Sequence, residues 1–467
     1  MDISEQQISA IVDRLVQQFS PKSSQTVSAQ SNTMLGCFEN VEAAINAAEQ
    51  AYFQYKNVPV KQRKLIIETI RQHCKKHLES LARMAVEETG FGRVKDKILK
   101  NELATFKTPG VEDLEPIAFT GDDGLTLIEH AAYGVIGSIT PCTNSSETVI
   151  SNSIAMIAGG NAVVFNPHPS AKKVSAQAVH ILNQAILAAG GPANLVTTVL
   201  NPTIESAQTL MHHPKTRLLV VTGGPAVVNV AMKSGKKVIA AGPGNPPVVV
   251  DETADLEKAA RDTVMSAGMD NNIICLVEKN IIVVDEVADE FKKLLVKHGA
   301  VELGAYQAKQ LEKVIVDGDH PNKNFVGKDI QIILKEIGLH VDDSKRIAIT
   351  EATKDHPFAV IELLLPVLPF IRARDFDEAM EIAYELEGGR FHTAAVHSKN
   401  IDRLHKMALK MNTSIFVKNG PCLAGLGAGG EGPASYTIAS PTGEGVTTAR
   451  HFTRLRRCVV SGHFRIV

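Results

Sequence analysis

Residues 134–167 read GVIGSITPCTNSSETVISNSIAMIAGGNAVVFNP. Two short apolar runs in it, Gly134–Thr140 and Ala162–Phe165, are typical of buried strands. Between them, Thr148–Ala158 has a helical pattern that two glycines would end. A strand, a helix and a second strand in this order predict a βαβ unit, in which parallel strands are covered on both faces.

The same alternation continues along the chain and predicts an α/β fold. Upstream, a helical pattern from Val41 to about Thr89 should end at Gly90, where a left-handed cap costs little. A second series begins near Leu256. The chain has 467 residues, more than the roughly 250–300 at which a single core stops growing, so we expect two doubly wound, Rossmann-like domains. Further elements are expected at Ala171–Ala189, Leu195–Leu200, Ile204–His212, Leu218–Val221, Ala226–Lys233, Val238–Ala241, Ile281–Val284, Glu286–Lys297, Val367–Ile371, Thr393–Val396 and Ile415–Val417.

The overall charge and the cysteines argue against several classes of protein. With 49 basic and 51 acidic residues, the chain offers no general attraction to phosphate backbones or anionic lipids. No apolar run reaches the roughly 20 residues that span a bilayer, and the amino end lacks a signal-peptide pattern. The 6 cysteines are scattered and show no zinc-binding spacing. We expect a soluble cytoplasmic protein with no nucleic-acid partner, no membrane partner and no metal.

Residues 1–20 have the pattern of a short amphipathic helix. Ile8, Ile11 and Leu15 recur at helical spacing and share one face. Residues 21–34 are rich in Ser, Gln, Asn and Thr, which predicts a flexible linker. The tethered helix either docks on its own domain or oligomer, or inserts its apolar stripe into a groove of another protein.

The carboxyl-terminal stretch Val446–Val467 alternates polar and apolar residues and carries Arg454, Arg456 and Arg457. Three arginines suit a nucleic-acid surface, but the balanced overall charge argues against that function. The alternation instead predicts a strand that completes the sheet of a neighbouring subunit. We therefore expect a homo-oligomer.

Three strand-to-loop junctions are candidates for ligand binding. Each follows the carboxyl end of a predicted strand, where open α/β sheets bind their ligands. Neither a G-x-G-x-x-G fingerprint nor a P-loop occurs at a first strand. In the junction at 222–225, paired glycines open a helix whose N–H groups could face a pyrophosphate, although a simple turn explains these glycines equally well. The junctions are Thr140-Pro141-Cys142-Thr143-Asn144, Asn166-Pro167-His168-Pro169 and Thr222-Gly223-Gly224-Pro225.

Several longer motifs resemble those of the aldehyde dehydrogenase superfamily. Their order and spacing are similar to those of the CoA-acylating branch found in bacterial microcompartments, which serves ethanolamine and propanediol utilisation. The resemblance covers nearly the whole chain. It implies an NAD-dependent enzyme that oxidises a short aldehyde, acetaldehyde or propionaldehyde, and transfers the acyl group to coenzyme A. The motifs are TGFGRVKDK (89–97), LLVVTGG (218–224), GNPPVVVDETADL (244–256), DNNIIC (270–275), TSIFVKNGPC (413–422), GLGAGGEG (425–432) and SPTGEGVTTAR (440–450).

The resemblance implies three reactive positions. A lone cysteine is more often a small buried apolar residue than a nucleophile, but Cys275 matches the nucleophile of the family, whose thiolate attacks the aldehyde. Asn144 and the backbone N–H of Cys275 match the donors to the oxyanion. His392 resembles a histidine near the nucleophile, and a near-neutral pKa would suit it to accept the proton of the CoA thiol. A purely structural histidine is the alternative.

The resemblance also implies where the cofactor binds. Glu362 aligns with the glutamate that holds the nicotinamide ribose. Ala241 stands where hydrolytic relatives carry the glutamate that activates water, so the acyl group should pass to CoA. Pro167 and His168 should receive the adenosine ends of NAD and CoA in turn. The predicted cofactor-binding residues are Thr140, Pro141, Pro167, His168, Thr222, Gly223, Gly224, Ala241, Gly242 and Glu362.

The same resemblance assigns a function to each part of the chain. Residues 1–20 would be a targeting helix that brings the enzyme into the microcompartment lumen by docking on a shell protein, and 21–34 its linker. Residues 35–255 would form the cofactor-binding domain and 256–435 the catalytic domain. Residues 436–467, with a contribution from 122–132, would form the oligomerisation arm of a homodimer or homotetramer.

Several alternatives stay open at the level of sequence. Cys142 and Cys422 are rival thiols. A hydrolytic aldehyde dehydrogenase and a catalytically silent scaffold of the compartment are the rival functions. One methylene in an apolar pocket changes selectivity by only about 1–3 kcal/mol, so the choice between acetaldehyde and propionaldehyde is not decided, nor is that between NAD and NADP.

Overall fold

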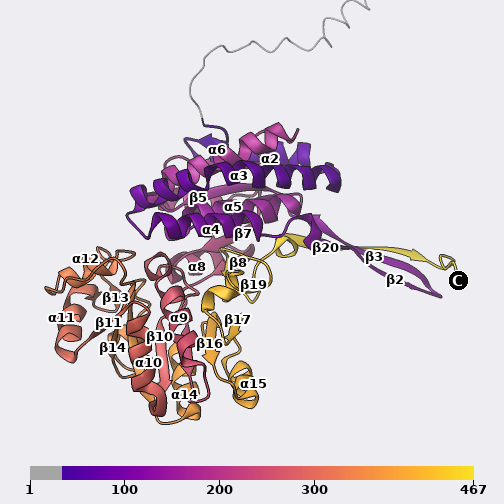
Figure 1. Cartoon of the computed structure of the whole chain (residues 1–467). Coiled ribbons are helices and arrows are strands. Elements are labelled where there is room, and N and C mark those ends of the chain that lie inside the picture. Colours follow the sequence, from indigo (N-terminus) through magenta and orange to yellow (C-terminus); the bar gives the residue numbers. More distant parts are fainter. Residues whose placement is uncertain (1–33) are drawn as a thin grey trace, which may run out of the picture. The chain divides into compact units, whose positions relative to one another are not determined.

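The computed structural model describes residues 34–467, which contain two parallel sheets covered by helices (Figure 1). The predicted helix at 1–20 lies outside this range, and so does the predicted linker except for Met34. The first sheet has the strand order β1-β6-β5-β4-β7-β8, and all its neighbouring strands are parallel. Its strands are β1 (Cys37–Phe38), β4 (Val135–Thr140), β5 (Ala162–Pro167), β6 (Val196–Val199), β7 (Thr216–Thr222) and β8 (Lys237–Ala241).

The order of the strands determines which face of the first sheet each helix covers. The central strands β4 and β5 are buried at every residue, as continuous apolar runs between two helical layers require. The chain steps from β4 to β5 to β6 and then returns past β4 to β7. Because such crossovers are right-handed, the reversal places α7 on the face opposite α5 and α6. The strand order thus reverses between β4 and β7, the kind of point at which open sheets bind ligands.

The structure has two helices where the sequence predicted one continuous helical pattern, and the second of them ends at the predicted glycine. The pattern from Val41 divides into α2 and α3, and Gly90 closes α3 in the left-handed conformation with φ 69°, as predicted. No helix among residues 34–467 is both long and apolar enough to cross a bilayer. The helices around the first sheet are α2 (Val41–Tyr55), α3 (Val60–Thr89), α4 (Val94–Phe106), α5 (Ser145–Ala158), α6 (Lys172–Ala188), α7 (Ile204–His212) and α8 (Pro225–Met232).

The second sheet has the strand order β11-β14-β15-β10-β9-β16-β17 and is also parallel throughout. Three of its strands, β9, β11 and β14, were not among the predicted elements, since short apolar runs show too little periodicity to identify every strand. The strands are β9 (Pro247–Val250), β10 (Asn280–Val284), β11 (Ala300–Leu303), β14 (Ile347–Glu351), β15 (Val367–Ala373), β16 (Thr393–His397) and β17 (Ile415–Lys418). The main helices are α9 (Leu256–Ala267), α10 (Asp285–Lys297), α11 (Ala305–Ile315), α14 (Phe376–Glu387) and α15 (Ile401–Met411).

The chain passes from the first sheet to the second between β8 and β9. This crossing lies ahead of residue 255, where we expected the first domain to end. Val248 of β9 pairs with Ile281 of β10 on one side and with Ala395 of β16 on the other. Residues 247–250 therefore belong to the middle of the second sheet, because their main-chain hydrogen bonds lie there.

A three-stranded antiparallel ribbon extends from the body of the protein (Figure 1). It consists of β2 (Ile117–Gly121), β3 (Gly124–Ala132) and β20 (Thr453–Ser461). Residues from both predicted parts of the arm, 122–132 and 436–467, thus meet, with Thr453 opposite Ala132 and Ser461 opposite Gly124. Within the described chain β20 is an edge strand, and its pairing with a neighbouring subunit stays a prediction.

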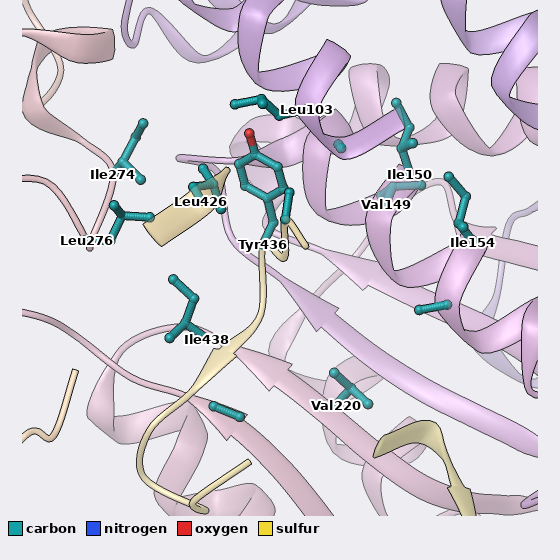
Figure 2. Packing of buried hydrophobic residues seen from close by; sticks show 14 of the residues in the cluster. Leu103, Val149, Ile150, Ile154, Val220, Ile274, Leu276, Leu426, Tyr436 and Ile438 are labelled. Atoms are coloured by element: carbon teal, nitrogen blue, oxygen red, sulfur yellow. The ribbon is translucent and has the colours of Figure 1, made fainter. Parts of the chain in front are cut away.

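A buried apolar cluster connects the helices of the first sheet with the loop that precedes β10 (Figure 2). Leu103 of α4 and Tyr436 lie in this cluster together with Ile274 and Leu276. Ile274 and Leu276 are each only 1% exposed, and they flank Cys275. Burying two large aliphatic side chains contributes about 1.5–3 kcal/mol each, so the loop is anchored on both sides of the cysteine.

Candidate active site

A cavity of about 600 Å³ contains most of the predicted site residues. From the first sheet it is lined by the carboxyl ends of β4, β5 and β7, and from the second by loops that precede β9, β10 and β15. Ala241 and His392 are not among the lining residues. The predicted residues that do line it are Thr140, Pro141, Asn144, Pro167, His168, Thr222, Gly223, Gly224, Gly242, Cys275 and Glu362.

A larger cavity, of about 870 Å³, contains none of the predicted residues. It is lined mainly by charged side chains, among them Glu351, Arg372 and Glu385. Arg372 already forms ion pairs with Asp285, Asp289 and Glu351. Since these charges satisfy one another, the smaller cavity is the better candidate for chemistry.

Asn144 offers an amide to the cavity from the start of α5. Its side chain does not cap the helix. Its Nδ2–H makes only a long contact of 3.4 Å with Oγ1 of Thr143, and its buried Oδ1 has no hydrogen-bond partner among the described residues. Buried amides are normally satisfied. The Asn144 side chain therefore has hydrogen-bonding capacity left for a bound molecule.

Cys275 lies in a loop with unusual backbone geometry. Asp270, Asn271 and Asn272 have positive φ values of 48°, 54° and 66° in succession, a conformation that Asp and Asn tolerate better than other side chains. Burial, and then the charge of Glu362, raise the pKa of Cys275 to about 12. We expected a thiolate, but the thiol is protonated at neutral pH in this structure because the surrounding protein disfavours the anion.

Glu362 faces the cavity and is held by a backbone group next to the nucleophile. Its Oε1 accepts a hydrogen bond of 3.2 Å from the N–H of Gly244. A Cβ atom at Gly244 would come within 2.5 Å of the carbonyl oxygen of Cys275, so a side chain here would displace the nucleophile. Burial raises the pKa of Glu362, which outweighs the opposite effect of Lys279.

His392 lies behind the cavity wall. A Cβ atom at Gly244 would lie 3.1 Å from its ring and 2.5 Å from the carbonyl oxygen of Cys275, which places His392 close to the loop of the nucleophile. Burial, and then the charge of Lys279, lower the pKa of His392 to about 4. The expected near-neutral titration is thus wrong for this state of the protein. The ring is neutral, its Nδ1 lies 2.8 Å from Oγ1 of Thr393, and its Nε2 has no partner among the described residues.

The first-sheet side of the cavity fits a dinucleotide. The buried Oγ1 of Thr140 has no hydrogen-bond partner in the part of the chain that the structure describes. Gly224 precedes α8, and a Cβ atom there would meet nothing within 4 Å, so a ligand could approach this backbone closely. Burial lowers the pKa of His168, which leaves its ring neutral beside the cavity.

The two rival thiols are less well placed for catalysis than Cys275. Cys142 lines the cavity, and burial raises its pKa. Cys422 is fully buried and does not line it, and burial raises its pKa still more strongly. Within residues 34–467, no three His, Cys, Asp or Glu side chains are grouped as a metal site would require.

Comparisons with known proteins agree with this geometry. A sequence profile of the aldehyde dehydrogenase family matches residues 13–311, more than half of the chain. The chain belongs to the aldehyde dehydrogenase family. It is 54% identical to the acetylating acetaldehyde dehydrogenase EutE of Salmonella typhimurium over 440 residues, which are 93% of this chain and 94% of that protein.

Two solved structures of aldehyde dehydrogenases are similar over nearly their whole length. The propionaldehyde dehydrogenase of Rhodopseudomonas palustris, with bound CoA and an acylated cysteine, has a TM-score of 0.91 and 47% identity, with 92% of this chain and 99% of that chain covered. A propionaldehyde dehydrogenase from the fucose-utilisation microcompartment of Clostridium phytofermentans has a TM-score of 0.91 and 47% identity, with coverages of 93% and 100%. The predicted fold class and family are confirmed.

Position 241 of this aldehyde dehydrogenase carries no acid. Ala241 ends β8, is 3% exposed and does not reach the cavity. Glu362 is the single carboxylate among the lining residues of the described chain. The wall thus lacks a second carboxylate that could activate water next to Cys275.

Three buried lysines of this aldehyde dehydrogenase were missed by sequence reasoning. Nζ of Lys279 donates to the carbonyl and side-chain oxygens of Asn272, at 2.5 and 2.7 Å, and to the carbonyl of Ile274 at 3.1 Å. Burial lowers the pKa of Lys279 to about 8. Lys97 and Lys100 of α4 are fully buried. Lys97 ends the motif at 89–97, and its spacing of one helical turn from Lys100 is the further sequence signal that places both side chains on one face of α4.

Proposed function

We propose that the protein is a CoA-acylating aldehyde dehydrogenase: a short aldehyde, NAD and CoA yield acyl-CoA, NADH and a proton. The observation that carries the proposal is one cavity in which Cys275 and Asn144 meet while position 241 offers no acid. A cavity lined in this way suits a thiol that becomes acylated and whose thioester is not hydrolysed by water. The acylated cysteine and bound CoA in the structure from Rhodopseudomonas palustris support the same chemistry.

Cys275 and Asn144 would carry the first half of the reaction. The sulfur of Cys275 attacks the aldehyde carbon, and its proton passes to solvent water as the C–S bond forms. Lys279 favours this step, since its positive charge lowers the pKa of Cys275 against the larger effects of burial and Glu362. The side-chain amide of Asn144 and the N–H of Cys275 donate to the oxygen that becomes negative. The nicotinamide, when bound, accepts the hydride, and Cys275 is left as a thioester.

The second half of the reaction depends on which nucleophile reaches the thioester. Water needs a base to attack it, and Ala241 provides none. The sulfur of CoA attacks the acyl carbon, the C–S bond to Cys275 breaks, and acyl-CoA leaves. Glu362 would hold the nicotinamide ribose, and Pro167 and His168 would hold the adenosine ends in turn. His392 remains our proposed acceptor of the CoA proton, since its ring is neutral and its Nε2 has no hydrogen-bond partner among residues 34–467.

A product assay with and without CoA tests this function. We expect NADH to form steadily from aldehyde and NAD only when CoA is present, with acyl-CoA as the product. Steady formation of NADH and free carboxylate without CoA would establish a hydrolytic enzyme instead. No thioacyl adduct on Cys275 by mass spectrometry would favour a silent scaffold. Aldehydes of increasing chain length, each with NAD and with NADP, decide substrate and cofactor preference in the same assay.

The proposed location is the lumen of a bacterial microcompartment, reached through residues 1–20. The apolar stripe of this segment and the microcompartment origin of the relative from Clostridium phytofermentans support the proposal. Residues 1–34 fused to a fluorescent protein should enter compartments assembled from shell proteins. The fusion carrying Leu15→Asp, which breaks the stripe, should stay outside; equal entry of both would contradict the proposal.

The ribbon of β2, β3 and β20 would join subunits into a homodimer or homotetramer. Its apolar side chains are exposed, with Leu455 at 64% and Val459 at 59%. Exposed apolar residues along an edge strand favour pairing with another chain. Sedimentation of the protein and of Leu455→Glu should show an oligomer and a smaller species, respectively.

A further inference from the structure

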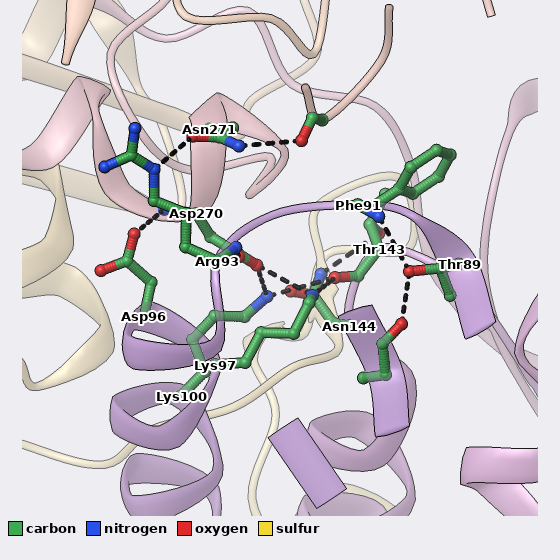
Figure 3. A network of polar contacts seen from close by, with 12 residues as sticks. Thr89, Phe91, Arg93, Asp96, Lys97, Lys100, Thr143, Asn144, Asp270 and Asn271 are labelled. Carbon is green, nitrogen blue, oxygen red and sulfur yellow. Dashed lines mark hydrogen bonds and ion pairs between the residues drawn. The ribbon is translucent and has the colours of Figure 1, made fainter. Parts of the chain in front are cut away.

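Three charged side chains form a buried ion cluster between the two sheets (Figure 3). Lys97 and Lys100 project from α4, and Oδ2 of Asp270 lies 3.0 Å from Nζ of the first and 2.6 Å from Nζ of the second. All three side chains are 0% exposed. Glu147 adds a second carboxylate oxygen 3.4 Å from Lys100.

Both ammonium groups have a second target in common. Nζ of Lys97 and Nζ of Lys100 also donate to the carbonyl oxygen of Thr143, at 3.3 and 3.1 Å. Thr143 directly precedes Asn144, and Asp270 begins the loop that leads to Cys275. Each lysine therefore connects the turn that presents the amide with the loop that presents the sulfur.

The backbone around Asp270 is held from the same helix. The N–H of Asp270 donates to Oδ2 of Asp96 at 2.9 Å, and its Oδ1 accepts from the N–H of Arg93 at 2.9 Å. A Cβ atom at Gly92 would come within 1.8 Å of that Oδ1, so this approach requires glycine. Positive φ values at 270–272 are costly unless surrounding contacts determine them. Here α4 and the turn before it supply those contacts.

Asp270 and Lys100 are ionised at neutral pH. Burial alone would raise the pKa of Asp270, but Lys100 and Lys97 outweigh it and hold that pKa below its usual value. Burial would lower the pKa of Lys100, yet Asp270 and Glu147 produce a net increase. Well-packed apolar residues often stabilise a fold as much as a buried ion pair does. The directed contacts of the cluster thus point to a role in geometry.

We propose that Lys97, Lys100 and Asp270 are positioning residues for the reaction. They hold the turn before Asn144 against the loop before Cys275, so that the amide and the sulfur address the same carbonyl group. The inference rests on the proposed function, because a carbonyl substrate needs both groups at once. None of the three side chains touches the cavity.

A double-mutant cycle tests the proposal. Asp270→Asn should lower kcat by about 10²-fold, the effect expected when reacting groups shift by about 1 Å. The KM for NAD should change by less than about threefold, because no side-chain hydrogen bond of Asp270 in the described chain goes to a residue that lines the cavity. In the background of Asn144→Ala, the same substitution should lower kcat by less than about threefold, because the amide it aligns is already gone. Lys97→Met serves in the same cycle if Asp270→Asn does not fold.

A matched control separates positioning from stability. Asp251 is also 0% exposed, pairs with Arg403 at 2.9 Å and accepts a hydrogen bond from Ser398, but it follows the far end of β9 from Gly244. Asp251→Asn should lower the melting temperature while kcat of the folded enzyme stays the same.

Each outcome is decisive. Equal losses of kcat in both backgrounds, or a loss no greater than that of Asp251→Asn, would overturn the proposal. So would the failure of both cluster variants to fold, because the cluster would then serve stability alone. Activity of the unmodified enzyme with aldehyde, NAD and CoA tests the proposed function separately, since the cycle only compares variants.

Discussion

The two sheets contribute to the cavity from opposite ends of their strands. Asn144 follows the carboxyl end of β4, and Thr222 ends β7. Cys275 and Glu362 instead precede β10 and β15, at the amino ends of strands in the second sheet. In a parallel sheet, carboxyl ends lead into helices whose free N–H groups bind ligands. Amino ends offer no such donors.

This difference explains why the two sides of the cavity are held in different ways. Loops at the carboxyl ends, such as that between β7 and α8, lead directly into the helices they begin. The loop before β10 is fixed by side chains: Lys279 bonds its carbonyl groups from within, and Lys97 and Lys100 hold Asp270 from outside. We infer that the first sheet supplies most of the binding residues and the amide that orients the carbonyl group, while the second supplies the reactive sulfur and Glu362 as a further contact for the cofactor. The predictions below test that division of labour.

The largest effect is expected at the nucleophile. Cys275→Ala should lower turnover by about 10⁴-fold or more, since it removes the sulfur that stores the acyl fragment. NADH formation and mass spectrometry of enzyme treated with aldehyde and NAD measure the loss of turnover and of the thioacyl adduct. The adduct should still form in Cys142→Ala. An adduct that persists in Cys275→Ala would assign the chemistry to the first sheet and break the comparison.

Asn144 is the carboxyl-end residue with the greatest expected effect on rate. Asn144→Ala should lower kcat by about 10²- to 10³-fold, the usual cost of removing one oxyanion donor. Its KM for NAD should barely change, because the amide serves the transition state. Steady-state kinetics with varied NAD check both values. Asn183→Ala, a buried amide of α6 away from the cavity, should retain kcat; a comparable loss there would show that Asn144 acts through stability.

The first-sheet side was predictable from sequence to a greater extent than the second. Continuous apolar runs identify buried strands, and a general rule places ligands at their carboxyl ends, so Thr140, Asn144 and Thr222 could be proposed together. No such rule covers amino ends, and there Cys275 and Glu362 were found by resemblance. The structure brings both of them to the cavity that the first-sheet residues line.

What sequence could not show is how buried charge is compensated. Lysine is usually a solvent-exposed residue, so the sequence did not predict the buried hydrogen bonds and ion pairs of Lys97, Lys100 and Lys279. The low pKa of His392 depends on complete burial, which a histidine before a short apolar strand does not reveal. Such features arise from residues far apart in the chain, and only the fold brings them together.

Two buried histidines at opposite ends of β16 sharpen the comparison within one strand. His392 precedes the strand and His397 ends it, and burial is the main cause that lowers each pKa to about 4. As the pH falls from about 6.5 to 4, the unfolded chain binds these protons before the folded one does, so the free energy of unfolding falls. Each histidine accounts for roughly 3 kcal/mol of that loss.

The substitutions His392→Asn and His397→Asn should therefore reduce the acid sensitivity of stability by similar amounts. Denaturant unfolding at several pH values measures this effect. Only His392→Asn should slow the transfer of the acyl group from Cys275 to CoA, by about 10²-fold, in single-turnover mixing of acylated enzyme with CoA. If both variants transfer at the unmodified rate, His392 is structural and CoA loses its proton elsewhere.

The smallest effect, at Glu362, separates binding from reactivity most directly. Glu362→Gln should raise the KM for NAD by about tenfold, through loss of a charged hydrogen bond. The same substitution removes a charge that raises the pKa of Cys275. It should therefore speed alkylation of that thiol by iodoacetamide at pH 8, by at most about tenfold per unit of pKa. Thr222→Val, on the first sheet, should raise the KM without changing alkylation. If Thr222→Val also speeds alkylation, the reactivity of the thiol depends on the first sheet as well. If Glu362→Gln does not speed it, the charge of Glu362 does not control that reactivity. Either result would contradict the proposed difference between the two sheets.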